Sequence, residues 1–325
     1  MTKFFDKKNI LKYILICIIL LLMLLIIVMP KISINSFWQG LIIWATNVLP
    51  AMLPYFILTK LLSYTQLTSK IGLFFSPITH KLYGVGGVAG YISIMSIISG
   101  YPVGAKITSE LYQDGIITSG QAKTIASFTS TSGPLFIIGT VGIGLFNSSQ
   151  LGIIILISHF LGAIINGLFY RYNGNDTQYK LHTQQSNNSN ILSDSMYSSI
   201  TSILIVGGFI ALFYMILQCL LHLNIFKIIT SPLNKLGIKE GITNGIISGL
   251  IEVTSGAIML SKCNLSFKII TPILTFLISF GGLSIHAQAL CFLQSFKMKY
   301  SEFLLQKTTH AIISSLLATI IVLIT

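Results

Sequence analysis

Long apolar runs recur along the chain at lengths that suit helices crossing a membrane. The first, residues 14–29, has 16 residues without a charged, amide or hydroxyl side chain, and a helix needs about 20 mostly apolar residues to span a bilayer. Another, at about 37–62, contains Pro50 and Pro54, which should kink the helix or open its hydrogen-bond ladder. Plainer runs of similar length lie at about 151–170, 198–221 and 301–324. The pattern predicts an all-α polytopic membrane protein.

The N-terminus places four lysines before the first apolar run, which is the charge order of a secretory signal peptide. Pro30, Lys31 and Ile32 follow the run, where a small-residue cleavage site would be needed. The sequence therefore favours an uncleaved first helix over a signal peptide that is removed.

Two other apolar regions, 85–147 and 237–295, are repeatedly interrupted by Gly, Pro, Ser and Thr. Each region holds two stretches that such a cluster divides into half-helices. The first stretch of each pair is predicted to form a re-entrant hairpin and the second a broken transmembrane helix. The stretches, with their breaks in parentheses, are 89–112 (99–104), 121–146 (130–134), 241–262 (252–256) and 267–293 (281–284). Before the third break, glycines recur every four residues, a ladder that favours close helix packing. They are Gly237, Gly241, Gly245 and Gly249.

The two interrupted regions match one another when the first is shifted by 152 residues without a gap. Nine positions are identical among the 39 from 94 to 132, where chance in so biased a composition would give about three. Two independent segments rich in Ser, Gly and Ile are the alternative explanation. The identical pairs are Ile94 with Ile246, Ser96 with Ser248, Gly104-Ala105 with Gly256-Ala257, Ser109 with Ser261, Ile117 with Ile269, Ser127-Phe128 with Ser279-Phe280, and Ser132 with Ser284.

The distribution of basic residues indicates how the two repeats are oriented. With the N-terminus in the cytoplasm, 14 of the 20 basic residues are assigned inside and 6 outside, in agreement with the positive-inside rule. Three full crossings then separate the hairpins, which makes the regions an inverted repeat, the architecture of many secondary transporters. The inside set is Lys3, Lys7, Lys8, Lys12, Lys60, Lys70, Lys81, Lys106, Lys123, Arg171, Lys180, Lys297, Lys299 and Lys307, and the outside set is Lys31, Lys227, Lys235, Lys239, Lys262 and Lys268.

The interrupted regions divide the chain into segments. Residues 1–84 are expected to form N-terminal transmembrane helices, 85–170 the first repeat, 198–236 a connecting helix and loop, and 237–325 the second repeat. Residues 171–197 are expected to be a cytoplasmic linker, because clusters of Asn, Gln and Ser there show no apolar periodicity.

Backbone that is unwound at membrane depth leaves N–H and C=O groups unpaired, which costs several kcal/mol per group unless they face protein or water. The four breaks are therefore expected to enclose a polar cavity. The N-termini of half-helices carry free N–H groups and partial positive charge, which favours a small anion such as a carboxylate. The candidate substrate-binding residues are Gly100, Tyr101, Pro102, Gly104, Lys106, Ser132, Gly133, Thr254, Ser255, Ser284, His286 and Gln288.

Three ionisable residues at the breaks carry specific hypotheses, each with a structural alternative. Lys106 would add a positive charge to the anion site, or extend from its helix to the cytoplasmic surface. Glu252 would couple transport to a proton or cation, pair with Lys106, or only cap a helix. His286 would donate to an anion and titrate near neutral pH, or only bond a neighbouring carbonyl. Structural roles are expected for the histidines on plainer helices, His159, His222 and His310.

Composition excludes several other classes of protein. With 53% hydrophobic residues, 9% charged residues and a mean hydropathy of +0.82, the chain has too few polar groups to cover a soluble globule. The net charge of +12 is attributed to lysines that hold loops on the cytoplasmic side of the membrane. No nucleic-acid partner is expected, because no basic stretch is interleaved with aromatics. Four scattered cysteines indicate neither disulfides nor a metal site, and no cofactor is expected. An enzyme is disfavoured because HExxH, GxSxG and P-loop patterns are missing.

Four motifs together resemble those of the YlbJ/SpoVV family of sporulation integral membrane proteins. They are SGYPVGAK at 99–106, SGPLFIIG at 132–139, Glu252 with Gly256-Ala257, and GLSIHAQ at 282–288. The resemblance covers about residues 49–318. It implies two nucleoside-recognition or gate domains with distant similarity to concentrative nucleoside carriers.

The resemblance also implies a function, the movement of dipicolinate across the outer forespore membrane during sporulation. Dipicolinate is a small planar dicarboxylate, which agrees with the anion site expected from the half-helices. Nucleoside specificity is not expected, because the first break has no carboxylate beside Pro102, unlike the hairpins of nucleoside carriers. The alternatives are a nucleoside-like or other small-anion carrier, a membrane enzyme, and a non-transporting scaffold for spore cortex formation.

The expected location is the cell membrane, as a multi-pass protein, and the outer forespore membrane during sporulation. The expected partners are the lipid bilayer and the small anionic substrate. The sequence leaves the coupling ion, the direction of flux and assembly into a homo-oligomer open.

Overall fold

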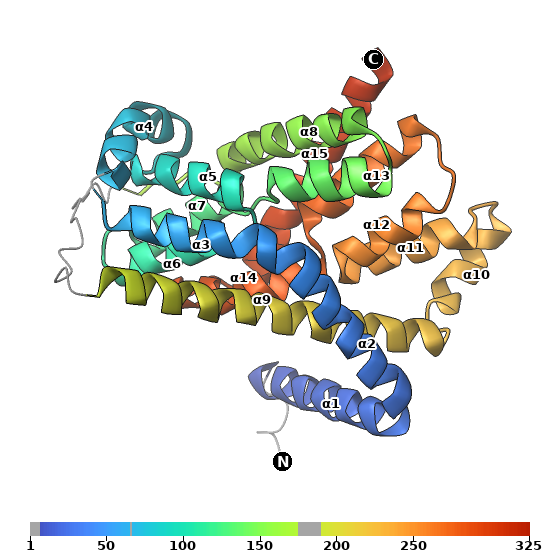
Figure 1. The fold of residues 1–325 in the computed structure, drawn as a ribbon. Coiled ribbons are helices and arrows are strands. Elements are labelled where there is room, and N and C mark those ends of the chain that lie inside the picture. The colour runs from blue at the N-terminus through green and yellow to red at the C-terminus, as the bar shows by residue number, and fades with distance from the viewer. Residues whose placement is uncertain (1–6, 66, 175–189) are drawn as a thin grey trace.

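The structure, a computed structural model, describes residues 7–65, 67–174 and 190–325. Every regular element in that part of the chain is a helix, as the apolar pattern predicted (Figure 1). Most of the predicted linker, 171–197, lies outside the described residues. The elements are α1 (Lys7–Val28), α2 (Pro30–Ile43), the π-helical η2 (Trp44–Val48), α3 (Leu49–Ser63), α4 (Leu67–Tyr83), α5 (Val88–Ser99), α6 (Val103–Gln113), α7 (Ser119–Thr129), the π-helical η3 (Leu135–Leu145), α8 (Ser149–Phe169), α9 (Ile191–His222), α10 (Lys227–Lys235), α11 (Glu240–Ile251), α12 (Val253–Ser261), α13 (Phe267–Phe280), α14 (Gly282–Leu293), the 3-10 helix η4 (Gln294–Phe296) and α15 (Tyr300–Ile324).

Among the described residues, four helical stretches are long and apolar enough to cross a membrane, and the number rises to six if two bent pairs each count as one span. The four stretches are α8, α9, α13 through η4, and α15, so the three plainer predicted spans are confirmed. The bent pairs are α1 with α2, at 106°, and α4 with α5, at 95°. Neither bend was predicted from the apolar pattern.

Two of the predicted spans differ from the structure in detail. The stretch predicted at 37–62 is divided by η2, which ends two residues before Pro50. The ladder opens there because Pro50 has no N–H to donate to the preceding turn. Helix α9 begins at Ile191, earlier than the predicted start at 198, and Asp194 in its first turn suits the positive end of the helix dipole.

All four breaks occur where the sequence predicted them. The first lies between α5 and α6, and the second between α7 and η3. The breaks in the second region are single residues, shorter than predicted. Glu252 is extended at φ −140° between α11 and α12, and Gly281 is left-handed at φ +91° between α13 and α14. A left-handed glycine ends a helix without the steric cost that a side chain would bring.

The second hairpin is closely packed through its glycines. A Cβ added to Gly256 would lie 2.2 Å from Cα of Gly249, and one added to Gly245 would lie 2.7 Å from Leu260 Cγ. The glycine ladder thus brings α11 and α12 together, as predicted. Gly237 is the exception, because an added Cβ would meet nothing within 4 Å and the residue instead takes φ +87° in the turn after α10.

The two hairpins lie apart, α5–α6 on one side and α11–α12 on the other, while α8 of the first repeat packs against α13 and α15 of the second (Figure 1). Both bounds of α11 are displaced by 152 residues from those of α5, which is the offset of the sequence repeat. In Figure 1, α4 to α7 lie at the left, α10 to α12 lie at the right, and α9 extends along both. Helix α15 packs against α13 and α8, and α9 packs against α2 and α3.

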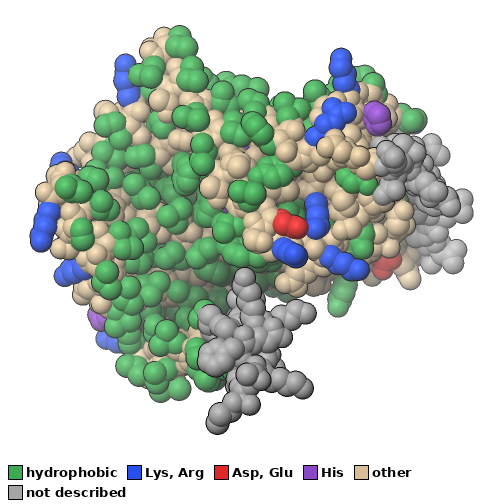
Figure 2. All heavy atoms as spheres, turned by 180° about the vertical axis from the view of Figure 1, so that it is seen from behind, with side chains coloured by type: hydrophobic (Ala, Val, Ile, Leu, Met, Phe, Trp, Pro, Cys, Tyr) green, Lys and Arg blue, Asp and Glu red, His purple; other side chains and the backbone are tan. Residues whose placement is uncertain are grey.

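The outer surface is suited to lipid. Figure 2 shows hydrophobic side chains over most of one face, with Lys and Arg side chains toward its two ends. Large apolar side chains such as Leu204, Phe169 and Ile320 are more than two-fifths exposed. Exposed apolar area of this extent is typical of a membrane-facing surface rather than of a soluble protein.

Candidate functional site

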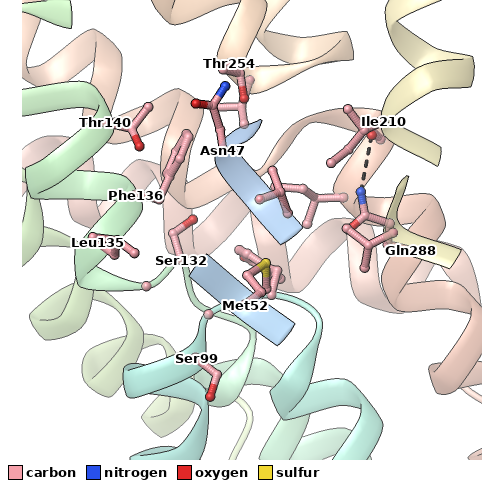
Figure 3. Close-up of a pocket in the computed structure, with 18 of the residues that line it drawn as sticks. Asn47, Met52, Ser99, Ser132, Leu135, Phe136, Thr140, Ile210, Thr254 and Gln288 are labelled. Carbon is pink, nitrogen blue, oxygen red and sulfur yellow. Dashed lines mark hydrogen bonds between the residues drawn. The ribbon is translucent and has the colours of Figure 1, made fainter. Parts of the chain in front are cut away.

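A cavity of about 140 Å³ lies where the four breaks meet (Figure 3). Ser99, Gly100 and Tyr101 line it from the first break, and Ser132 and Gly133 from the second. Glu252 and Thr254 come from the third, and Ser284 and Gln288 from the first two turns of α14 after the fourth. The prediction that the breaks share a cavity is confirmed.

The rest of the wall is more apolar than predicted. Helices α2 and α3, η2 and α9 close the cavity on the side away from the breaks. Figure 3 shows Asn47, Thr140 and Met52 around the same space. Polar groups are therefore few and are placed mainly at the breaks, a pattern typical of small-molecule sites. The apolar lining residues are Ile43, Val48, Met52, Ile98, Leu135, Phe136, Val206, Ile210, Val253 and Ile285.

The two breaks of the first half are in direct backbone contact. A Cβ added to Gly100 would lie 2.7 Å from the backbone nitrogen of Gly133, and Gly100 has φ +76°. Only glycine suits that position, because it permits both the positive φ and the approach of the second chain segment. The contact fixes Tyr101 and Ser132 on neighbouring parts of the cavity wall.

Glu252 caps α12 from the cavity wall. Its side chain is 5% exposed and accepts hydrogen bonds from Thr254 N (3.0 Å, Oε1), Ser255 N (2.7 Å, Oε2) and Ser255 Oγ (2.6 Å, Oε2). The cap satisfies N–H groups that the break would leave unpaired. The carboxylate also occupies the helix N-terminus where a substrate anion was expected, and it does not pair with Lys106.

The fourth break presents the start of α14 to the cavity. No side chain caps α14, whose N-cap is Gly281. Gln288 Nε2 donates to Ser284 Oγ at 3.4 Å, so these two polar side chains lie together one turn apart on the cavity wall. An uncapped helix N-terminus with a neighbouring hydroxyl can accept an anionic group.

The structure brings eight of the thirteen predicted site residues into the cavity wall. These are Gly100, Tyr101, Ser132, Gly133, Glu252, Thr254, Ser284 and Gln288. The other five lie outside the cavity lining: Pro102, Gly104, Lys106, Ser255 and His286. Two of the five support the wall from behind, because Ser255 bonds Glu252 and an added Cβ at Gly104 would lie 2.3 Å from Thr129 O.

Lys106 and His286 are held by protein groups away from the cavity. Lys106 is 9% exposed, and its Nζ donates to Ser198 O at 3.2 Å and lies 5.7 Å from the centre of the Phe56 ring. It neither reaches the cavity nor extends to the surface. His286 is 1% exposed, with Nε2 at 2.8 Å from Phe280 O and Nδ1 at 3.3 Å from Tyr300 Oη. This is the carbonyl-bonded arrangement that the sequence left as an alternative.

Sequence reasoning missed Lys307, which was assigned to the cytoplasmic side of the last span. The residue is 2% exposed on α15, inside the protein, and its Nζ donates to the Tyr101 hydroxyl and to Ser130 O (2.8 Å). His310 and His159, expected to be structural, lie in the same buried cluster. The available signal was a lysine within an apolar stretch followed three residues later by a histidine.

Comparison with known proteins gives one informative match. The chain is 29% identical over 309 residues to the sporulation integral membrane protein YlbJ of Bacillus subtilis (strain 168). The chain is a homologue of YlbJ. The alignment covers 87% of this chain and 76% of YlbJ. No protein-family model matches the chain, and no solved structure matches it.

The homology with YlbJ, the apolar pattern of the sequence and the long apolar helices all indicate a membrane protein. The chain is an integral multi-pass membrane protein, related to a membrane protein of sporulation. The name of YlbJ refers to sporulation and to the membrane and gives no substrate.

Proposed function

We propose that this YlbJ homologue is a secondary transporter or facilitator that holds a small organic anion in the cavity between the four helix breaks. The meeting of all four breaks at one cavity carries the proposal. Broken helices that meet at a shared site are how many secondary transporters bind solutes near the bilayer midplane. A scaffold for cortex formation would not need such a cavity.

The two repeats supply a means of alternating access. In this proposal they are inverted with respect to the membrane, and the hairpins α5–α6 and α11–α12 enter from opposite sides. Each repeat contributes one hairpin and one broken helix to the cavity wall. Rocking of one repeat against the other would open the cavity first to one side of the membrane and then to the other.

The size of the cavity suits a solute with a single ring. Its volume of about 140 Å³ is close to that of a cavity of about 150 Å³ that admits benzene. Dipicolinate, a pyridine ring with two carboxylates, is the substrate that the family resemblance implies, and the proposed site of action is the outer forespore membrane. Its ring would contact the apolar wall, and a carboxylate would meet the uncapped N-terminus of α14, where Ser284 lines the cavity.

Glu252 is proposed to couple transport to a proton or cation. It is the charged side chain on the wall of this cavity, and three donors hold its carboxylate in place. A proton or cation that reaches this carboxylate would reduce its repulsion of a substrate anion. Coupling through an intramembrane acid is a common device in pumps and transporters.

A second candidate is a carrier for a neutral, nucleoside-like solute. It is favoured by the neutral polar side chains that face the cavity beside Glu252, namely Asn47, Thr140 and Gln288. Amide and hydroxyl groups of this kind would bond a sugar or a base without needing charge. The gate-domain resemblance points the same way. An enzyme is the least supported alternative, because the wall holds no nucleophile with a base beside it.

Uptake by the purified protein in liposomes tests these candidates. Proteoliposomes should accumulate labelled dipicolinate, and an excess of unlabelled dipicolinate should compete better than its neutral dicarboxamide or than uridine. Efficient uptake of uridine without dipicolinate uptake would favour the neutral-solute carrier. Uptake of neither, by protein shown to be folded, would remove the proposal of a carrier for these solutes.

A further inference from the structure

A buried ammonium group lies behind the cavity wall, on the last helix. Lys307 Nζ has three N–H bonds to donate, and the structure offers three acceptors. They are the Tyr101 hydroxyl, Ser130 O at 2.8 Å and His310 Nδ1 at 3.3 Å. The three acceptors come from the first break, the second break and α15 itself. Lys307 therefore joins both breaks of the first half to the C-terminal helix.

Lys307 is the group of this cluster that can carry a positive charge. The backbone N–H of Ser132 donates to His159 Nε2 at 2.9 Å, which places the proton of His159 on Nδ1, 2.7 Å from Ser279 Oγ. His310 accepts from Lys307 at Nδ1 and donates from Nε2 to His159 O at 3.0 Å. Each imidazole thus carries one proton and is neutral in this network.

No carboxylate balances that charge within the described part of the chain. The ion pairs found there are Lys60 with Glu110 and Lys123 with Glu302, and neither includes Lys307. A buried charge without a counter-ion is costly, even when its hydrogen bonds are satisfied. An anion bound nearby would lower that cost.

Tyr101 connects the ammonium to the cavity. Tyr101 lines the cavity, and its hydroxyl accepts from Lys307, which leaves the hydroxyl proton without an acceptor among the described residues. A Cβ added to Gly281 would lie 3.7 Å from the Tyr101 hydroxyl, so the hydroxyl is placed at the uncapped N-terminus of α14. The hydroxyl of Ser99 is also buried at the cavity wall without a partner in the described chain.

We infer that Lys307, acting through Tyr101, is the charge that makes this cavity selective for carboxylate anions. A substrate carboxylate would accept from the Tyr101 hydroxyl and from the start of α14, with the ammonium behind the tyrosine as its counter-ion. Lys307 is thus a specificity-determining residue that does not touch the substrate. This inference rests on the proposed function as an anion carrier, and it identifies Lys307 as the group that balances the charge of the anion.

Binding to the purified full chain in lipid nanodiscs tests the inference, with dipicolinate and its neutral dicarboxamide as probes. Lys307→Met should weaken dipicolinate binding by about thirtyfold or more, the loss expected when one member of a buried charge pair is removed. Binding of the dicarboxamide should change less than about threefold, since hydrogen bonds between neutral groups contribute little net energy. A purely structural role for Lys307 would weaken both probes alike.

Lys106→Met is the matched control, because Lys106 is also a buried lysine bonded to a backbone carbonyl but lies outside the cavity lining. Its selectivity for the dicarboxylate should equal that of the wild type. Tyr101→Phe keeps the ammonium and the ring while removing the hydroxyl, and it should cost about tenfold in dipicolinate affinity. This variant decides the matter if Lys307→Met does not fold.

Unchanged selectivity in Lys307→Met or in Tyr101→Phe, with wild-type protein that binds and transports dipicolinate, would overturn the inference and leave the anion carrier intact. Wild-type protein that binds the dicarboxamide but not dipicolinate would overturn both. Dipicolinate binding by the wild-type protein therefore distinguishes failure of this inference from failure of the proposed anion carrier.

Discussion

At the scale of single residues, Glu252 has two roles that one carboxylate can fill together. As an N-cap it pairs with two backbone N–H groups and one hydroxyl, and as a wall residue it meets the cavity. From the sequence, capping and coupling were alternatives. The structure establishes the cap, and coupling remains part of the proposal.

Glu252→Gln should separate the two roles. The amide keeps one acceptor oxygen and loses the charge, so the loss of part of the cap should reduce the free energy of unfolding by about 1–2 kcal/mol. Dipicolinate uptake should fall to background while the protein stays folded in the membrane. Thermal unfolding and proteoliposome uptake measure the two effects.

Glu240→Gln is the control, because it changes an exposed carboxylate in the first turn of α11, and it should match the wild type in both measurements. Full uptake by Glu252→Gln would exclude coupling at Glu252.

The lysines show why residue-scale expectations from sequence fail in a membrane protein. Lys106 and Lys307 were both assigned to the cytoplasmic side by the predicted order of the spans and the positive-inside rule. Both are buried. Lys307 is held inside the protein by a hydrogen bond to Tyr101, 206 residues earlier in the chain. The sequence close to Lys307 or to Tyr101 does not indicate that contact.

At the scale of elements, the breaks could be predicted because their causes are local. Pro102, Pro134 and the left-handed Gly281 each interrupt a helix through their own backbone chemistry. The 95° bend between α4 and α5 also has a local cause, because α4 ends at the left-handed Gly84 (φ +69°). The π-helical η3 has no such cause, and its geometry depends on how neighbouring helices pack, which a single sequence read by pattern does not contain.

The second hairpin offers a direct test of its close packing. Gly256→Ala would place a Cβ 2.2 Å from Cα of Gly249, against backbone that cannot move aside. The hairpin should be forced apart, at a cost of about 1–3 kcal/mol or more in the free energy of unfolding. Thermal unfolding of the detergent-solubilised protein is the measurement.

Gly208→Ala is the matched control, because Gly208 lies within α9 and an added Cβ would meet nothing within 4 Å. It should leave the protein unchanged or stabilise it by about 0.5–1 kcal/mol, as alanine is a better helix former. Equal stability of Gly256→Ala and Gly208→Ala would contradict the packing described for the hairpin.

At the scale of the whole molecule, the repeat in the sequence corresponds to a repeat in the positions of the helices. Helices α5 and α11 have equal lengths and bounds displaced by the repeat offset, and both repeats supply walls to one cavity. The sequence predicted that shared cavity from the cost of unpaired backbone in lipid. It did not predict the apolar lining from α2, α3 and α9, because those helices reach the cavity only through tertiary packing.

The most direct test of the central claim is protection of a cavity cysteine by substrate. In a variant that carries Ser284→Cys and keeps Cys291, with Cys17, Cys219 and Cys263 replaced by serine, a small neutral thiol reagent should modify both sites on α14. Dipicolinate at a concentration that fills about nine-tenths of the sites should slow modification at position 284, on the cavity wall, by about tenfold. Cys291 is exposed outside the cavity lining, and its rate should stay the same. Equal modification rates at position 284 with and without dipicolinate, in protein that still transports it, would place the substrate elsewhere and contradict the account.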